Sequence, residues 1–293
     1  MTFYNFLFFL FFLLAGCQDK DSPDPVEQVV EVSFREPTLT PIVPGLIDET
    51  SGMADSRSTA NALWIHEDSG NPAEITLISY AGAVLKKIPV KNSVNRDWED
   101  MALVHDGSSG KNIMYLADIG DNNMQYDTYD IYRFDEPGAN DIEINNVEKI
   151  TFRYADGPHD AEAILVDEMS KDIFIITKRD TKSGIYRLAY PQNLTAINTA
   201  VLEGSLDYSG VTSAAISADG KEIVVKTYTH INYYDRKENE LLPVSLKRKS
   251  QIIPYLMEAQ GEAICWKKDN KGFFTLSERG LLPAIDLRYY EKN

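Results

Sequence analysis

The sequence predicts an all-β protein, and more specifically a β-propeller of five blades. Short segments in which a polar residue leads into small apolar residues recur about every fifty residues, a period typical of a four-stranded blade. The intervals between them contain strand-like runs separated by turn residues, and no sustained helical period occurs. Six blades are the alternative. A two-sheet sandwich is less favoured because it does not account for the repeat.

The repeated segments divide the chain into similar stretches of predicted strands. They begin at Ser51, Glu99, Glu162, Ser213 and Glu262. The first stretch predicts strands over Gly52–Ala54, Ala62–His66, Ile75–Tyr80 and Val84–Val90. The second predicts Asp100–Val104, Ile113–Ala117, Tyr129–Phe134 and Glu148–Tyr154. The third predicts Ala163–Val166, Ile173–Thr177, Gly184–Ala189 and Ala200–Glu203, and the fourth is similar, with a turn over Ala218–Lys221 before a strand over Glu222–Thr227.

The last stretch is one strand short, which predicts how the ring closes. It contains only Ala263–Trp266, Phe273–Leu276 and Ile285–Tyr290, whereas the strand-like segment Val29–Val43 has no partner of its own. A ring closed by the N-terminal strand in the C-terminal blade explains both observations. Closure also removes the exposed sheet edges that an open array would carry.

The N-terminus has the pattern of an exported protein. The apolar run FYNFLFFLFFLL over residues 3–14 has the length of a signal-peptide core and is too short to span a bilayer. It ends in Leu13-Leu14-Ala15-Gly16-Cys17, which resembles the bacterial lipobox. That resemblance implies cleavage before Cys17 and a lipid on Cys17, and Gln18 after it resembles an outer-membrane sorting choice. We therefore expect a signal peptide over 1–16, an acidic tether over 17–28 and a propeller domain over 29–293, facing the periplasm or the cell surface.

Composition limits the partners and the sources of stability. The net charge is −16, which argues against nucleic acid or anionic lipid as a partner of the folded domain. Cys17 and Cys265 are the two cysteines, and with Cys17 lipidated no internal disulfide can form. We expect Cys265, which lies in an apolar strand, to be a core residue.

Carboxylates are concentrated where the first strand of each predicted blade begins. If the repeats are blades, Glu99, Glu162 and Glu262 point at one axis, with Glu49 beside them, and unpaired they would repel one another. Oxygen ligands of this kind suit a hard cation, Ca²⁺ or Mg²⁺. Asp118 and Asp121 follow a second strand and form a candidate second cation loop, although tight turns need the same residue types. The alternative is that the carboxylates lock neighbouring blades together by hydrogen bonds.

Cationic side chains are expected at the same end of the blades. Lys178, Arg179, Lys226 and Arg279 lie at the ends of the second strands of later predicted blades, and Arg and Lys there suit an anionic ligand. His159, next to an aspartate, is the candidate general base. The alternative is that the cations pair with the neighbouring acids.

A family resemblance rests on a succession of short acidic motifs. These are Glu49-Thr-Ser-Gly, Asp68-Ser-Gly-Asn, Asp97-Trp-Glu-Asp, Asp118-Ile-Gly-Asp-Asn, Asp160-Ala-Glu-Ala and Gln260-Gly-Glu-Ala. Together they resemble bacterial secreted β-propeller lipoproteins of uncharacterised activity and, more distantly, the phytase-like, gluconolactonase and paraoxonase propellers. That resemblance implies a divalent cation in the central channel, with Glu49, Glu99, Glu162 and Glu262 at the matching positions.

Two functions remain open at the level of sequence. One is a lipid-anchored, divalent-metal-dependent hydrolase of a phosphoester or another anionic small substrate at the channel mouth. The other is a non-catalytic propeller that binds a glycan, a peptide or a partner protein. The fold class is compatible with both.

Overall fold

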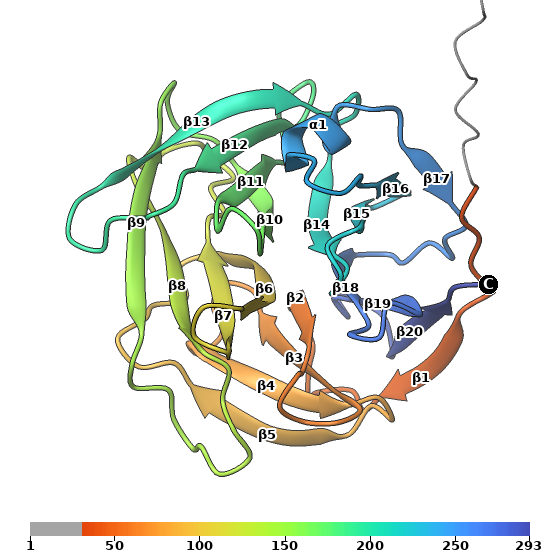
Figure 1. Ribbon diagram of the computed structural model, residues 1–293. Coiled ribbons are helices and arrows are strands. Elements are labelled where there is room, and N and C mark those ends of the chain that lie inside the picture. Colours follow the sequence, from red (N-terminus) through yellow and green to blue (C-terminus); the bar gives the residue numbers. More distant parts are fainter. Residues whose placement is uncertain (1–30) are drawn as a thin grey trace, which may run out of the picture. The chain divides into compact units, whose positions relative to one another are not determined.

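The all-β prediction is confirmed. In the computed structural model, which describes residues 31–293, the regular structure consists of twenty strands and one helical turn, α1 (Leu242–Leu246). The strands surround a central axis in a propeller-like arrangement (Figure 1). Within the described residues, no helix has the length and apolar character needed to cross a bilayer. The predicted signal peptide and the whole predicted tether, including Cys17, lie outside the described residues.

Neighbouring strands pair antiparallel in all four sheets, apart from one parallel pair in the largest sheet. The first contains β2 (Thr50–Asp55), β3 (Ala62–Glu67), β4 (Glu74–Ser79) and β5 (Val84–Pro89). An eight-stranded sheet contains β6 (Trp98–Asp106), β7 (Lys111–Asp118), β8 (Tyr129–Asp135), β9 (Glu148–Tyr154), β10 (Ala161–Val166), β11 (Ile173–Thr177), β12 (Gly184–Leu188) and β13 (Asn198–Ser205). The third contains β14 (Val211–Ile216), β15 (Glu222–Thr227), β16 (Ile231–Asp235) and β17 (Gln251–Ile253). The fourth contains β18 (Gly261–Trp266), β19 (Gly272–Ser277), β20 (Ile285–Glu291) and β1 (Thr38–Ile42).

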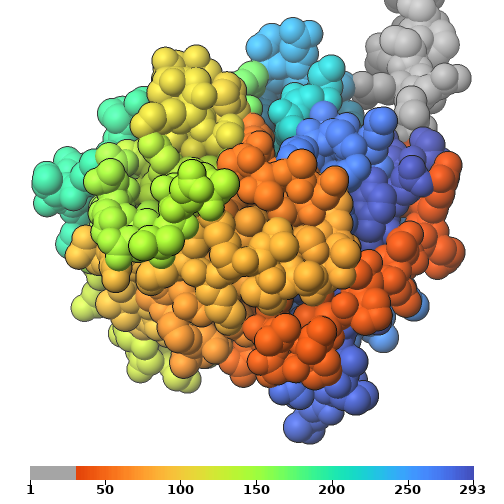
Figure 2. Space-filling view, turned by 90° about the horizontal axis from the view of Figure 1, so that it is seen from below, coloured from red at the N-terminus to blue at the C-terminus, as the bar shows by residue number. Residues whose placement is uncertain are grey.

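The N-terminal strand closes the ring, as the sequence predicts. Strand β1 pairs antiparallel with β20, from Thr38 opposite Tyr289 to Ile42 opposite Ile285. In Figure 2 the red atoms of this N-terminal segment lie beside the blue atoms of the C-terminal segment. The edge of β20 is therefore covered, which is the protection against edge-to-edge association that a closed ring provides.

Five inner strands line the axis and contact one another in a closed order. Strand β2 contacts β6, β6 contacts β10, β10 contacts β14, β14 contacts β18, and β18 contacts β2. Small residues permit this close approach. A Cβ atom added at Gly52 would lie closer than 3.0 Å to Nε2 of His66 and to the backbone N of Met101, so only glycine allows β2 to lie this near β6.

The core lies between successive sheets, where large side chains from both are buried. Trp64 and Trp98 are fully buried in one such layer, and Trp98 contacts Tyr132 with ring centroids 6.2 Å apart. Cys265 is buried and unpaired, as expected for a core residue. Burial of these apolar surfaces is the main stabilising contribution in a domain that shows no disulfide among its described residues.

Two features of the fold are absent from the sequence prediction. Strands β9 and β13 pair in parallel over Asn198–Ala200, which joins two meanders into the eight-stranded sheet. Residues 242–246 form the short helix α1, which starts with a proline in its first turn. The longest repeat interval contains the long strands β6 and β7 and the 136–147 connection, with no additional sheet.

Candidate metal centre at the mouth of the inner strands

All five inner strands have the same irregularity near their first residue. The pairing register with the next strand skips one residue in each of them, as a β-bulge does. The skipped residues are Ser51, Glu99, Glu162, Thr212 and Glu262. A bulge redirects a side chain away from the regular alternation of the strand, and bulges are frequent beside functional sites.

The bulges correct the sequence alignment at one position. The sequence pattern aligns the fourth repeat on Ser213, whereas the residue equivalent to the glutamates is Thr212. Thr212 and Ser213 are adjacent small hydroxyl residues, so the sequence alone could not distinguish the two registers. Ser213 is instead equivalent to Asp100, and its Oγ donates a hydrogen bond to Asp100 Oδ1 at 3.0 Å.

Several carboxyl groups gather at this end of the inner strands, and we call them the acidic mouth. The acidic mouth consists of Asp68, Asp97, Glu99, Glu162, Glu262 and Glu278. Oxygens of Asp68, Asp97 and Glu99 all lie within 4.8 Å of one another. Glu99, Glu162 and Glu262 are buried, with relative exposures of 6%, 3% and 6%. The three carboxylates that meet come from the loop after β3, the loop before β6 and the bulge of β6.

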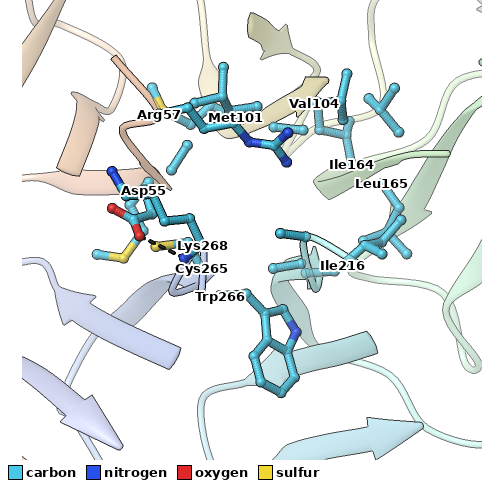
Figure 3. Close-up of a pocket in the computed structure, with 18 residues that line it drawn as sticks. Asp55, Arg57, Met101, Val104, Ile164, Leu165, Ile216, Cys265, Trp266 and Lys268 are labelled. Atoms are coloured by element: carbon cyan, nitrogen blue, oxygen red, sulfur yellow. Dashed lines mark hydrogen bonds between the residues drawn. The ribbon is translucent and has the colours of Figure 1, made fainter. Parts of the chain in front are cut away.

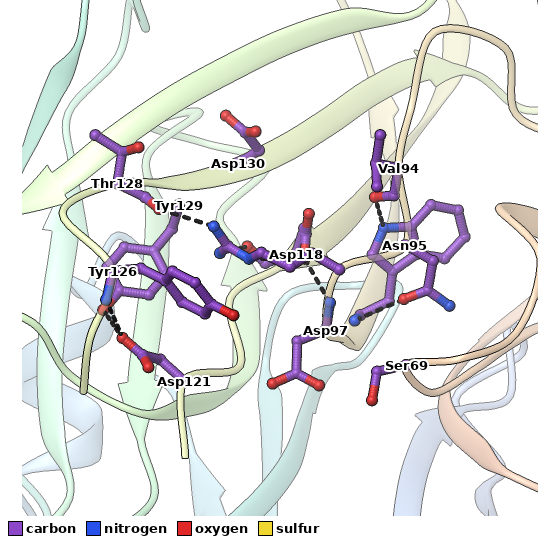
Figure 4. Close-up of polar contacts among 12 residues, drawn as sticks. Ser69, Val94, Asn95, Asp97, Asp118, Asp121, Tyr126, Thr128, Tyr129 and Asp130 are labelled. Carbon is purple, nitrogen blue, oxygen red and sulfur yellow. Dashed lines mark hydrogen bonds and ion pairs between the residues drawn. The ribbon is translucent and has the colours of Figure 1, made fainter. Parts of the chain in front are cut away.

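Local hydrogen bonds position Asp68 and Asp97. The backbone N–H of Asp97 donates to Asp118 Oδ1 at 2.8 Å, a contact visible in Figure 4. The side chain of Asn95 donates to the carbonyl of Asp68 at 2.8 Å and accepts from the N–H of Trp98 at 3.1 Å. Since Trp98 is fully buried, both loops are attached to the core of the protein.

A glycine in the loop after β7 leaves the space in which the carboxylates meet. A Cβ atom added at Gly120 would lie closer than 3.0 Å to Glu99 Oε1 and to Asp97 Oδ2. The backbone N–H of Gly120 donates to the carbonyl of Asp97 at 3.2 Å, which keeps the loop beside the acidic mouth. This glycine lies between the predicted ligands Asp118 and Asp121.

Burial and mutual repulsion favour the protonated forms of these carboxyl groups. Burial, together with the nearby charges of Asp97 and Glu262, raises the pKa of Asp68 to about 6. Burial and the charges of Glu262 and Asp68 raise the pKa of Glu278 to about 8. Burial and the charge of Glu162 raise the pKa of Glu99 well above its usual value. Bringing these carboxylates together in their charged form therefore costs free energy of folding, and a bound cation would reduce that cost.

One ammonium group partly neutralises the acidic mouth. Lys178 Nζ lies 2.5 Å from Glu162 Oε1 and donates to the hydroxyl of Tyr228 at 3.1 Å. Tyr228 in turn donates to Glu262 Oε1, whereas Glu262 Oε2 is buried without a hydrogen-bond partner. Burial alone would lower the pKa of Lys178, but the charges of Glu162 and Glu262 outweigh it and raise that pKa, so the side chain remains an ammonium.

The remaining predicted cation ligands lie in other contacts. The backbone N–H groups of Gln125 and Tyr126 and the hydroxyl of Tyr129 all donate to Asp121, which folds its own loop. Asp118 accepts the Asp97 N–H and lies 3.8 Å from the guanidinium of Arg96. Glu49 accepts a hydrogen bond from the side chain of Asn71 at 2.7 Å.

The other predicted cationic residues each contact an acid or a carbonyl. Arg179 lies 2.5 Å from Asp160, and Arg279 lies 2.6 Å from Asp48. Lys226 is fully buried, donates to the carbonyl of Gly261 and lies over the ring of Tyr255. Burial lowers the pKa of Lys226 to about 8. These contacts agree with the alternative in which the cations pair with neighbouring groups.

His159 lies apart from the acidic mouth. Its Nε2 is 2.8 Å from the hydroxyl of Tyr186 and 3.2 Å from Asp156, and its Nδ1 is 3.4 Å from Asp180. Its ring also packs edge-on against Tyr154, with centroids 4.9 Å apart. None of these neighbours belongs to the acidic mouth, so the role of His159 as a general base remains a prediction.

The sequence predictions include Asp68 and Asp97 among the acidic residues at the strand ends, but not among the metal ligands. Both stand at strand ends in the motifs Asp68-Ser-Gly-Asn and Asp97-Trp-Glu-Asp. The signal that distinguishes them is their position at the ends of neighbouring meanders. Asp68 follows the second strand of one meander, and Asp97 precedes the first strand of the next.

The opposite end of the inner strands is mostly apolar, with Asp55, Arg57 and Lys268 as its charged residues. A cavity of about 60 Å³ is lined there by side chains that include Met53, Met101, Ile164, Ile216 and Cys265 (Figure 3). At its rim, the backbone N–H of Lys268 donates to Asp55 Oδ2 at 2.7 Å.

No protein-family model and no curated protein sequence matches this chain. Among solved structures, the hydrazine synthase of Kuenenia stuttgartiensis is similar with 13% identity and a TM-score of 0.41, over 82% of this chain and 59% of that one. An auxiliary nutrient binding protein from Bacteroides thetaiotaomicron VPI-5482 is similar with 8% identity and a TM-score of 0.48, over 84% of this chain and 69% of that one. Likenesses this distant carry no function over to this protein. The resemblance to phytase-like, gluconolactonase and paraoxonase propellers stays a prediction.

Proposed function

We propose that this protein is a lipid-anchored, extracytoplasmic β-propeller that binds a divalent cation, Ca²⁺ or Mg²⁺, at the acidic mouth and holds an anionic small molecule through that cation. The observation that carries the proposal is the meeting of Asp68, Asp97 and Glu99 within 4.8 Å of one another. Three carboxylates this close together are the kind of ligand set that a hard cation such as Ca²⁺ or Mg²⁺ prefers. The buried Glu262 Oε2, which has no donor, adds negative charge beside it.

Five blades are the finer proposal for the fold. Support comes from the closed order of the inner strands β2, β6, β10, β14 and β18, each followed by three further strands, with β1 supplying the last one. The eight-stranded sheet is then two blades whose outer strands β9 and β13 pair in parallel. Five equivalent bulges give each blade one side chain at the mouth.

The cation is the element that would attract an anion. Lys178, Arg179, Lys226 and Arg279 already contact a carboxylate or a carbonyl, so they offer little uncompensated positive charge. Without a cation, the acidic mouth repels phosphate and carboxylate groups. With a cation bound between Asp68, Asp97 and Glu99, its open coordination positions would accept an anionic oxygen.

Hydrolysis of a phosphoester or lactone is the second candidate function. A divalent cation polarises a bound phosphoryl or carbonyl oxygen and lowers the pKa of a bound water. Glu162, a buried neighbour whose charge raises the pKa of Glu99 and whose Oε1 pairs with Lys178, would be the candidate proton acceptor. Hydrolysis of p-nitrophenyl phosphate or of a simple lactone that requires Ca²⁺ or Mg²⁺ would support this candidate. Cation binding without turnover would reject the hydrolase candidate and leave only the binding function.

A thermal shift tests the cation site with a matched pair of glycine variants. Cation that binds only the folded state adds about 2.7 kcal/mol at a hundredfold excess over Kd, so Ca²⁺ or Mg²⁺ should raise the melting temperature of metal-stripped protein. Gly120→Ala should abolish that rise because its Cβ would occupy the space between Glu99 and Asp97. Gly107→Ala is the control, since its Cβ would meet open space. If millimolar cation leaves the melting temperature of the wild type unchanged, the proposed cation site is wrong.

The lipid anchor is tested separately. Cys17→Ala should release the protein from the membrane fraction or leave it unprocessed, since lipidation contributes about 0.8 kcal/mol per buried CH₂. A variant with normal signal cleavage that still fractionates with membranes would contradict the anchor.

A further inference from the structure

A groove of about 670 Å³ lies at the end of the strands opposite the acidic mouth. It is bounded by the ends of β6 and β8, the starts of β7 and β9, and the turn after β10. Its volume falls within the roughly 300–1,000 Å³ of small-molecule sites. None of the residues of the acidic mouth lines it, so it is separate from the proposed cation site.

The charged side chains that line the groove are all paired. Within it, Lys171 lies 2.7 Å from Asp106, Arg133 lies 2.6 Å from Glu148, and Lys111 lies 2.5 Å from Asp135. The two remaining acids of the lining pair with arginines. Glu168 lies 3.0 Å from Arg57, and Asp167 binds Arg236 through two contacts of 2.9 and 3.0 Å. A charged ligand would have to break one of these pairs, so the groove favours a neutral one.

Two tyrosine rings give the groove apolar surface. Tyr190 is 49% exposed, and the ammonium of Lys171 lies 5.6 Å from its ring centroid. Tyr115 is buried in the floor, where its phenol interacts with Arg133. Tyrosine combines a flat apolar face with a polar tip, so an exposed ring such as that of Tyr190 can stack on a ligand while polar groups around it form hydrogen bonds.

We infer that this groove binds a neutral oligosaccharide. A sugar ring has an apolar C–H face, which suits Tyr190, and hydroxyl groups that both donate and accept hydrogen bonds. Paired carboxylates and cations supply acceptors and donors together, and hydrogen bonds to charged groups are the stronger ones. The exposed amides of Asn145 and Asn146 at the rim also supply hydrogen-bond donors and acceptors.

Calorimetric titration of the mature full-length protein tests the inference. Maltotriose, cellotriose, mannotriose and N,N′,N″-triacetylchitotriose are the probes, and EDTA is present so that the outcome does not depend on the cation site. At least one trisaccharide should bind with a Kd of about 1 mM or tighter. Tyr190→Ala should weaken that binding about tenfold, whereas Tyr190→Phe, which keeps the ring, should bind within about threefold of the wild type.

Tyr289→Ala is the matched control. A lysine ammonium, that of Lys267, also lies 5.6 Å from the ring centroid of Tyr289, but Tyr289 does not line the groove. This variant should bind the trisaccharide as the wild type does. No binding by any of the four probes at about 10 mM would overturn the inference. Binding that Tyr190→Ala leaves unchanged would overturn it too, as would tighter binding of the anionic digalacturonate.

Discussion

The two ends of the inner strands differ in the kind of side chain that the same ring of strands can hold. At the mouth end, the bulged residues include three buried glutamates. At the opposite end, the ring encloses a cavity of only about 60 Å³ in which apolar side chains such as Met53, Met101 and Ile164 outnumber the charged ones. Bulges and loops give the mouth end room and polar partners, whereas regular pairing further along the strands leaves space only for packing. The carboxyl groups of the mouth and most of the apolar packing therefore belong to different positions along the same strands.

Asp100 marks the boundary between these two ends. It is fully buried, and its carboxylate accepts hydrogen bonds from the N–H of Ile164 at 2.9 Å, the N–H of Met101 at 3.0 Å and Ser213 Oγ at 3.0 Å. These partners belong to β6, β10 and β14, so one carboxyl group joins three inner strands. This contact is an instance of the structural lock that the sequence left open, on the residue next to the proposed ligand Glu99.

Asp100→Ala should have the largest effect on stability. The change leaves two buried N–H groups and a hydroxyl without their acceptor, at about 1–3 kcal/mol for each unsatisfied group, so we expect a loss of about 3–5 kcal/mol in urea unfolding. Asp207→Ala on the exposed surface should cost less than about 0.5 kcal/mol. A loss for Asp100→Ala no larger than that of Asp207→Ala would show that the boundary is not a lock.

Lys178→Met should destabilise the protein less, and in a manner that depends on pH. The variant leaves Glu162 buried beside other carboxylates without its partner, which costs about 3 kcal/mol when Glu162 is charged. Protonation of Glu162 relieves this cost, so the loss should be smaller at pH 5 than at pH 8. Ca²⁺ should stabilise the variant more than it stabilises the wild type. An equal loss at both pH values would contradict a role for charge at the mouth.

An effect of pH is also expected in metal-stripped wild-type protein, without any substitution. The pKa of Asp68 rises from 3.8 to about 6 on folding, and that of Glu278 from 4.5 to about 8. Between these values the folded protein holds protons that the unfolded chain has released, so stability should fall as pH rises from about 4 to 8. Saturating Ca²⁺ should flatten that decline. Differential scanning calorimetry across this range, with and without Ca²⁺, measures both slopes, and identical slopes would count against a cation at these carboxyls.

The sequence predicted the strands well because their pattern is local. Runs such as Ile113–Ala117 and Ile173–Thr177 lie within β7 and β11, and the unpaired N-terminal strand correctly indicated ring closure. The same pattern also predicted at which end of the inner strands the carboxylates lie. The pattern did not predict that Thr212 is equivalent to the glutamates. A bulge shifts the register by one residue and has no distinctive sequence.

The partners of long charged side chains could not be predicted. Lys226 and Arg279 were expected at an open mouth, but one is buried against Gly261 and Tyr255 and the other pairs with Asp48. These partners come from segments distant in sequence, so only the tertiary structure brings them together. Among the many acids, Asp68 and Asp97 are distinguished by the space beside Gly120, which is a property of three loops and not of any one motif.

The most direct test of the cation site is the anomalous difference density of crystals grown with and without millimolar Ca²⁺. The account predicts one peak in the calcium crystals that is absent from crystals grown in EDTA, about 2.3–2.6 Å from a carboxylate oxygen of each of Asp68, Asp97 and Glu99. The peak should disappear in Gly120→Ala and persist in Gly107→Ala. Calcium crystals with no peak among these three carboxylates, or with the peak at another place in the protein, would contradict the account.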